Sequence, residues 1–141
     1  MQHRRILPNE VLLGEVAAVL RDGREAVIVP AGDSMLPFIR GGRDRVALRR
    51  RESAAPGDIV LARIDGRYVL HRVLACADGR LTLMGDGNLR GTECCDASDV
   101  LGTAVEIIRP DGSRRVPGKA RLWRILRPLR RILLAIYKRI A

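Results

Sequence analysis

The stretch "GDIVLARIDGRYVLHRVLACADGRLTLMGD", residues 57–86, decides the fold class that the sequence predicts. It contains three runs rich in Val, Ile and Leu, which are separated by the pairs Asp65-Gly66 and Asp78-Gly79. An Asp-Gly pair placed between two such runs is a strong signal for a tight β-turn. We therefore expect three consecutive strands that form two hairpins.

Similar runs lie on both sides of this stretch, at residues 25–30, 45–50 and 102–110. Turn residues bound the runs, at Gly41-Gly42, Pro56-Gly57-Asp58, Gly87-Asn88 and Asp111-Gly112. Short segments rich in β-branched residues and bounded by Gly, Pro and Asp are typical of strands. The sequence thus predicts a mainly β fold, a small compact body of about six short strands.

Helical patterns flank the predicted β body. Residues 8–21 place apolar side chains at helical spacing, with Asn9 as the expected N-cap and Asp22-Gly23 as the stop. We expect three parts: a helical lead-in at residues 1–24, the β domain at residues 25–117 and a basic amphipathic tail at residues 118–141.

In the tail, six aliphatic side chains fall on one helix face at about 100° per residue. They are Leu122, Leu126, Leu129, Leu133, Ile136 and Ile140. Ile125, Ile132 and Tyr137 flank this face, basic residues fill the opposite one, and Pro128 is expected to kink the helix or to begin its second half.

The positive charge of the chain belongs to this tail. Residues 119–141 contain eight of the 26 basic residues and no acid, which leaves 18 basic against 16 acidic residues elsewhere. We expect a contact with an anionic membrane surface. The alternatives are docking of the apolar face on the β body or on another subunit, and a nucleic-acid role, which the confinement of the charge to the tail disfavours.

Residue content argues against several other sites. Cys76 and the adjacent Cys94-Cys95 lack zinc-ligand spacing, and neighbouring cysteines close a disulfide only with strain. We therefore expect no metal and a reducing compartment, the cytoplasm.

Gly85-Asp86-Gly87 lacks the third glycine and the helix of a phosphate-binding loop, so no cofactor is expected. Pro8, Glu10 and Glu15 interrupt the first apolar run, which is unlike a signal peptide or a transmembrane span.

Ser34, within "AGDSMLPFIRGG" at residues 31–42, is the candidate nucleophile. A serine hydroxyl attacks a carbonyl only where a base accepts its proton. Of the two histidines, His3 lies in a basic terminus and His71 in a predicted strand. His71 is the candidate base, and the alternative is an ordinary, hydrogen-bonded strand histidine.

Three blocks in this order resemble the signal-peptidase and SOS-repressor superfamily of serine peptidases. They are Ser34-Met35, Gly57-Asp58-Ile59-Val60 and Gly85-Asp86-Gly87-Asn88. His71-Arg72 is similar to the His-Arg pair of microsomal and archaeal signal peptidases, whereas the repressors carry lysine as the base. The resemblance implies a peptidase-like β domain, with Ser34 as nucleophile and His71 as general base.

The resemblance also implies roles for neighbouring residues. Met35 would shape the floor of the site, and the backbone amide of Ser34 would contribute to the oxyanion hole. Gly32, Val29 and Leu70 would line a groove between the strand before Ser34 and the strand bearing His71. Such walls clasp an extended peptide by main-chain hydrogen bonds.

The acid that orients His71 has three candidates. Asp86 is the first choice because it lies in the third block, and the alternative is that it only stabilises a turn beside Gly87. Histidine-type relatives carry another acid a little further on, where this chain has Thr92. Glu93 is therefore the second choice and Asp96 the third. Asp58 and Arg72 are assigned structural roles.

The sequence leaves three functions open. The first is a serine endopeptidase that cleaves a peptide or precursor protein, peripherally at the inner face of a membrane. The second is a peptide-binding module of the same fold without turnover. The third is a self-cleaving regulatory domain, which the missing upstream DNA-binding module disfavours. The oligomeric state is left open.

Overall fold

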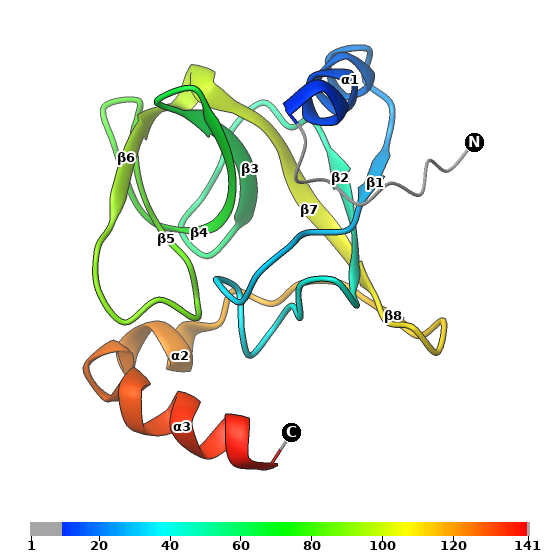
Figure 1. Cartoon of the computed structure of the whole chain (residues 1–141). Coiled ribbons are helices and arrows are strands. Elements are labelled where there is room, and N and C mark those ends of the chain that lie inside the picture. Colours follow the sequence, from blue (N-terminus) through cyan, green and yellow to red (C-terminus); the bar gives the residue numbers. More distant parts are fainter. Residues whose placement is uncertain (1–9, 141) are drawn as a thin grey trace.

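The computed structural model describes residues 10–140, with side chains from Leu13 onward. Its strands are β1 (Ala26–Ile28), β2 (Arg45–Arg49), β3 (Ile59–Ile64), β4 (Arg67–Ala77), β5 (Arg80–Met84), β6 (Glu93–Asp96), β7 (Val100–Ile108) and β8 (Arg114–Arg115). Its helices are α1 (Glu10–Arg21), α2 (Arg121–Ile125) and α3 (Arg130–Ile140), with the 3-10 turns η1 (Ala97–Asp99) and η2 (Arg127–Leu129). The mainly β fold that the sequence predicts is confirmed (Figure 1).

The strands form one curled antiparallel sheet. Neighbours follow the order β1-β2-β7-β3-β4-β5-β6, and β8 pairs with β7. Both predicted hairpins are present, since β3 pairs with β4 across Asp65-Gly66 and β4 with β5 across Asp78-Gly79. Each aspartate has a φ of 50°. The tight turn requires positive φ, and Asp tolerates it better than most residues.

The sequence did not predict two of the strands, β6 and β8. β6, with the sequence Glu-Cys-Cys-Asp, pairs with β5 alone and buries one residue, Cys95. β8 consists of two exposed arginines. A strand at the edge of a sheet buries little, so its composition lacks the apolar run that marks a central strand.

Helix α1 covers one side of the sheet and ends where the sequence predicts. Its Leu20 is fully buried in the main core, and Val16 and Val19 pack against that core. The amide of Asp22 still bonds to the carbonyl of Ala18, and Gly23 follows with a φ of 78°. The predicted N-cap, Asn9, and the other histidine, His3, lie outside the described residues.

The C-terminal helical segment, residues 119–140, bends back beneath the loop that joins β5 to β6 (Figure 1). Pro128 lies in η2, between α2 and α3, and the predicted interruption of the helix is confirmed. None of the described helices is both long and apolar enough to cross a bilayer.

Candidate active site

Ser34 lies in a tight turn between β1 and β2. The turn is closed by bonds from the Leu36 amide to the Asp33 carbonyl (3.1 Å) and from the Ile39 amide to the Met35 carbonyl (3.0 Å). Met35 and Leu36 are buried, whereas Ser34 is half-buried. The two apolar side chains therefore anchor the turn in the core and leave the serine at its surface.

Glycines hold this turn from two sides. A Cβ at Gly87 would overlap the carbonyl oxygen of Asp33, and one at Gly85 would overlap that of Ser34. The amide of Gly87 donates to the Ser34 carbonyl at 2.8 Å. On the other side, a Cβ at Gly41 would overlap the backbone of Gly32. Only residues without a side chain permit such close backbone approach, so these glycines fix the position of Ser34.

His71 lies in the middle of β4, opposite Val60 of β3. It is buried, with 8% of its surface exposed, yet it lines a cavity of about 360 Å3 that Ser34 also lines. The fold thus brings the predicted nucleophile and the predicted base to the same cavity, although 37 positions separate them in the chain.

Glu93 contacts the ring of His71, Oε1 against Nδ1. The strand register explains this pairing. His71 and Val73 lie on the same face of β4, Val73 pairs with Leu83, and Leu83 pairs with Glu93 at the start of β6. Side chains at paired positions share a face of the sheet, so Glu93 lies on the face of His71.

Asp86, the first choice for the acid at His71, lies elsewhere, and that assignment is corrected. Its carboxylate binds Arg72 through Nε (2.8 Å to Oδ1) and Nη2 (2.6 Å to Oδ2). Arg72 follows His71 directly, and successive side chains of a strand point to opposite faces. The acid that pairs with Arg72 therefore cannot also reach His71. Asp96, the third choice, pairs with Arg80 on the surface.

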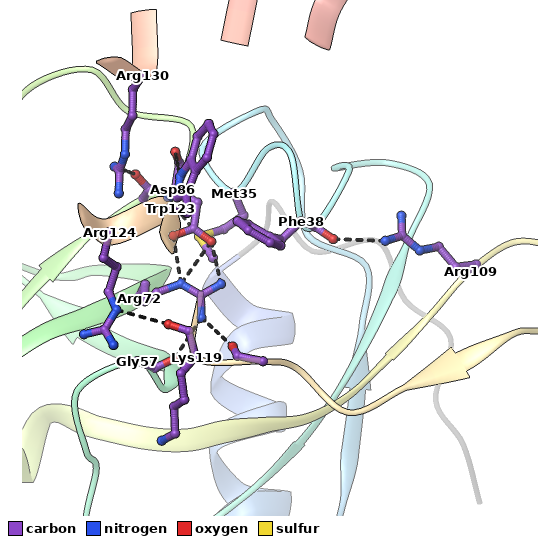
Figure 2. A network of polar contacts seen from close by, with 12 residues as sticks. Met35, Phe38, Gly57, Arg72, Asp86, Arg109, Lys119, Trp123, Arg124 and Arg130 are labelled. Atoms are coloured by element: carbon purple, nitrogen blue, oxygen red, sulfur yellow. Dashed lines mark hydrogen bonds and ion pairs between the residues drawn. The ribbon is translucent and has the colours of Figure 1, made fainter. Parts of the chain in front are cut away.

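The pair of Arg72 and Asp86 is structural, as the sequence predicts for Arg72. Both side chains are buried, with 1% and 0% exposed. The remaining nitrogen of Arg72, Nη1, donates to the carbonyls of Gly57 and Gly118, each at 2.8 Å. The guanidinium also lies over the ring of Phe38, 5.2 Å from its centroid (Figure 2). The arginine thereby holds four segments together, those of Phe38, Gly57, Asp86 and Gly118.

Asp58, the other residue predicted to be structural, holds its own loop in place through two contacts of its carboxylate. One carboxylate oxygen accepts from the amide of Ala55 at 2.9 Å, and the other contacts Nζ of Lys119. Lys119 packs tightly against Gly57, whose φ is 94°. The loop before β3 is in this way bound to the start of the C-terminal helical segment.

The C-terminal helical segment holds the loop of residues 85–88. Nε1 of Trp123 donates to the carbonyl of Asp86 at 2.9 Å, and Arg130 donates to the carbonyls of Gly85 and Asn88 at 3.2 and 3.3 Å (Figure 2). Arg130 is 1% exposed, and this burial lowers the pKa of its guanidinium. The sequence suggested no such role, because both residues belong to a pattern that also fits a separate surface helix.

Three of the four predicted groove residues line the cavity: Gly32, Met35 and Leu70. Val29, the fourth, is not among the described residues that line it. The cavity has further apolar walls that the sequence did not predict, contributed by Leu13, Ile28, Ile39, Leu61, Tyr68 and Val69. Helical and strand periodicity marked them only as core. Their convergence on one cavity depends on the curl of the sheet.

A family model described as Peptidase S24-like matches residues 9–103, more than half of the chain. The matched region contains Ser34, His71 and Glu93. The comparison with curated proteins gave no match. The matched family lies in the superfamily of repressors and signal peptidases that the sequence resembles, which confirms that prediction. Histidine as the base stays a prediction.

Proposed function

Because the chain belongs to the Peptidase S24-like family, we propose that it is a serine endopeptidase of the signal-peptidase type, with Ser34 as nucleophile and His71 as general base. One observation carries the proposal: Ser34 and His71 line the same cavity, and Glu93 contacts the imidazole at Nδ1. This is the arrangement of a nucleophile, a base and an orienting acid that serine hydrolysis needs.

In this proposal the Nδ1–H group of His71 donates a hydrogen bond to Glu93, which leaves Nε2 to accept the proton of Ser34. The serine oxygen then attacks the scissile carbonyl, and the backbone amide of Ser34 stabilises the oxyanion. The imidazolium returns its proton to the leaving amine as the peptide bond breaks. Water hydrolyses the acyl-enzyme by the same steps in reverse, which restores the free serine.

The proposed substrate is an extended peptide or precursor segment with small side chains next to the cleaved bond. β1 stands at the end of the sheet order, and the residues Pro30, Ala31 and Gly32 that follow it line the cavity together with the start of β4. An edge strand offers its backbone to a substrate that adds as a further strand. The apolar walls suit short aliphatic side chains better than charged ones.

We place this activity in the cytoplasm, at the inner face of a membrane. Cys94 and Cys95 are sequence neighbours, a spacing that disfavours a disulfide and suits a reducing compartment.

The decisive experiment is labelling with a serine-directed acylating probe, read by intact mass. We expect one adduct on the wild-type chain and none on Ser34→Ala or His71→Ala. Ser53→Ala is the matched control, because Ser53 is exposed and lies away from the cavity; it should label fully. An adduct that survives Ser34→Ala would contradict the assignment. Binding of peptides by a folded wild type that never forms an adduct would favour the peptide-binding module instead.

A further inference from the structure

The C-terminal helical segment exposes an apolar surface of unusual regularity. Eight large apolar side chains are exposed in the described part of the chain, and six of them lie in this segment. We call these six the apolar stripe: Leu122, Ile125, Leu129, Ile132, Ile136 and Ile140. Their spacing of three or four residues places them along one side of a helical path.

The stripe differs from the one expected from the sequence. Leu126 and Leu133 were expected in it but are half-buried, whereas Ile125 and Ile132 were expected only at its margins and are 75% and 60% exposed. The reason is that the segment docks on the β body through another face, which contains Trp123, Arg130 and the buried Leu134. That contact leaves the stripe facing solvent.

Helix α3 therefore has three faces. Arg130 and Leu134 form the docked face, and Ile132, Ile136 and Ile140 follow one another at every fourth position on the apolar face. Among the basic residues, Arg139 lies beside Ile132 on the side away from the docked face, whereas Arg131 and Lys138 lie between Arg139 and the docked face. Docking of the segment on the β body is thus already complete without the stripe.

Positive charge accompanies the stripe along its length. Five exposed basic residues lie within two positions of its members in the sequence: Arg121, Arg127, Arg131, Lys138 and Arg139. Within the described residues none of the five belongs to an ion pair. The segment contains no acid to balance them. Apolar side chains next to unpaired cations are the composition of helices that lie in a membrane interface.

We propose that the apolar stripe lies in the headgroup region of an anionic membrane, with the flanking arginines and lysines near lipid phosphates. The positive charge near the stripe is complementary to the negative charge of anionic lipid headgroups, which favours a membrane as the binding partner. A second copy seated on the stripe would bring two sets of unpaired cations together, which is unfavourable. Nucleic acid would engage the cations but would leave the aliphatic side chains in water.

The proposal also orients the peptidase. The docked face of the same segment holds the loop of residues 85–88, and that loop fixes the Ser34 turn. A membrane bound at the stripe therefore lies at a fixed position relative to the cavity. The lipid contact itself does not depend on the proposed activity.

Vesicle flotation of the full chain tests the proposal. We expect the wild type to float with vesicles of phosphatidylglycerol and phosphatidylcholine, and at least tenfold less with phosphatidylcholine alone. Ile132→Glu/Ile136→Glu should lose at least tenfold in binding to the anionic vesicles, and Ile125→Glu, on α2, should lose several-fold. Val116→Glu is the matched control, since Val116 is 78% exposed and lies outside the segment; it should float as the wild type does.

Ser34→Ala should also float normally, which separates this proposal from the proposed function. Circular dichroism should show that the variants keep the fold, because the substituted side chains are exposed. Three results would overturn the proposal: no flotation of the wild type, flotation that the stripe variants retain, or a wild-type dimer in sedimentation that the double variant abolishes. The last would assign the stripe to a second copy of the chain.

Discussion

Two neighbouring residues of β4, His71 and Arg72, each bind an acid, and the two pairs behave differently. Arg72 and Asp86 are fully buried, and each guanidinium nitrogen has a partner at 2.6–2.8 Å. The side chains of His71 and Glu93 are 10% and 26% exposed, and His71 lines the cavity. Glu93 is the hydrogen-bond partner of the imidazole within the described residues. A fully bonded pair holds the fold, whereas a pair with one free ring nitrogen is available for proton transfer.

The sharpest test of this difference is Glu93→Gln. Without the carboxylate the imidazolium loses its stabilising charge and its preferred tautomer, so we expect the acylation rate to fall by about 10³-fold. The stability should change by less than about 1 kcal/mol because the side chain is partly exposed. The measurement is the rate of probe incorporation, followed by mass.

Asp96→Asn is the matched control for this change. Asp96 lies in the same strand but pairs with Arg80 on the surface. Its substitution should leave the acylation rate unchanged. Equal losses in the two variants would mean that Glu93 acts through the strand and not through the ring of His71.

The substitution Asp86→Asn should lower the free energy of unfolding. Removing one partner leaves the Arg72 charge buried without compensation, which costs about 3–5 kcal/mol. That is a large part of the roughly 5–15 kcal/mol that holds a domain of this size. Urea unfolding followed by circular dichroism measures the loss.

The double substitution Arg72→Met/Asp86→Leu sharpens the same point. Removing both charges removes the desolvation penalty as well, so the double variant should recover a large part of the stability lost in Asp86→Asn. A double variant as unstable as the single one would show that the carbonyl contacts of Arg72, and not the ion pair, carry the effect.

Gly87→Ala should have an intermediate effect. The new methyl group meets the carbonyl of Asp33, so the loop or the Ser34 turn must shift, at about 1–3 kcal/mol. We expect lower stability and a reduced acylation rate together. Gly14→Ala is the control, because no atom lies within 4 Å of its added methyl group. It should stabilise α1 by about 0.5–1 kcal/mol.

Trp123→Phe should have the smallest effect on the stability of the buried pair. It removes the bond from Nε1 to the Asp86 carbonyl, worth about 1 kcal/mol. Phenylalanine retains a ring for the edge contact with Phe38, which lies 6.0 Å from the Trp123 ring. Differential scanning calorimetry should therefore show a lowered Tm with a cooperative transition. An unchanged Tm would mean that the bond contributes nothing net.

The sequence was sufficient to predict the strands whose side chains are buried and both hairpins. It also singled out Ser34 and His71, which the fold brings to one cavity, and their catalytic roles stay predictions. It was not sufficient for the choice between Asp86 and Glu93. That choice follows from the register, in which Glu93 faces Leu83 and Val73, while Asp86 follows Met84 on the face of Arg72. The register can be assigned only when both paired strands are known. β6 has too few apolar residues to be predicted as a strand from the sequence.

The docked face of the C-terminal helical segment could not be predicted from the sequence either. Periodicity shows that Ile125, Leu126 and Ile132 lie near one another on a helix, but not which of them turn towards the body. Trp123 and Arg130 decide the rotation of the segment through their bonds to the 85–88 loop. The hydrogen bonds of two side chains thus decide which face of the segment docks, and the apolar pattern alone does not.

Trp123 is the single tryptophan of the chain and is half-buried against the carbonyl of Asp86. Its fluorescence is therefore an intrinsic reporter of the loop beside Ser34. Release of the segment would expose the indole to water and shift its emission to longer wavelength. That shift can be followed without any attached dye.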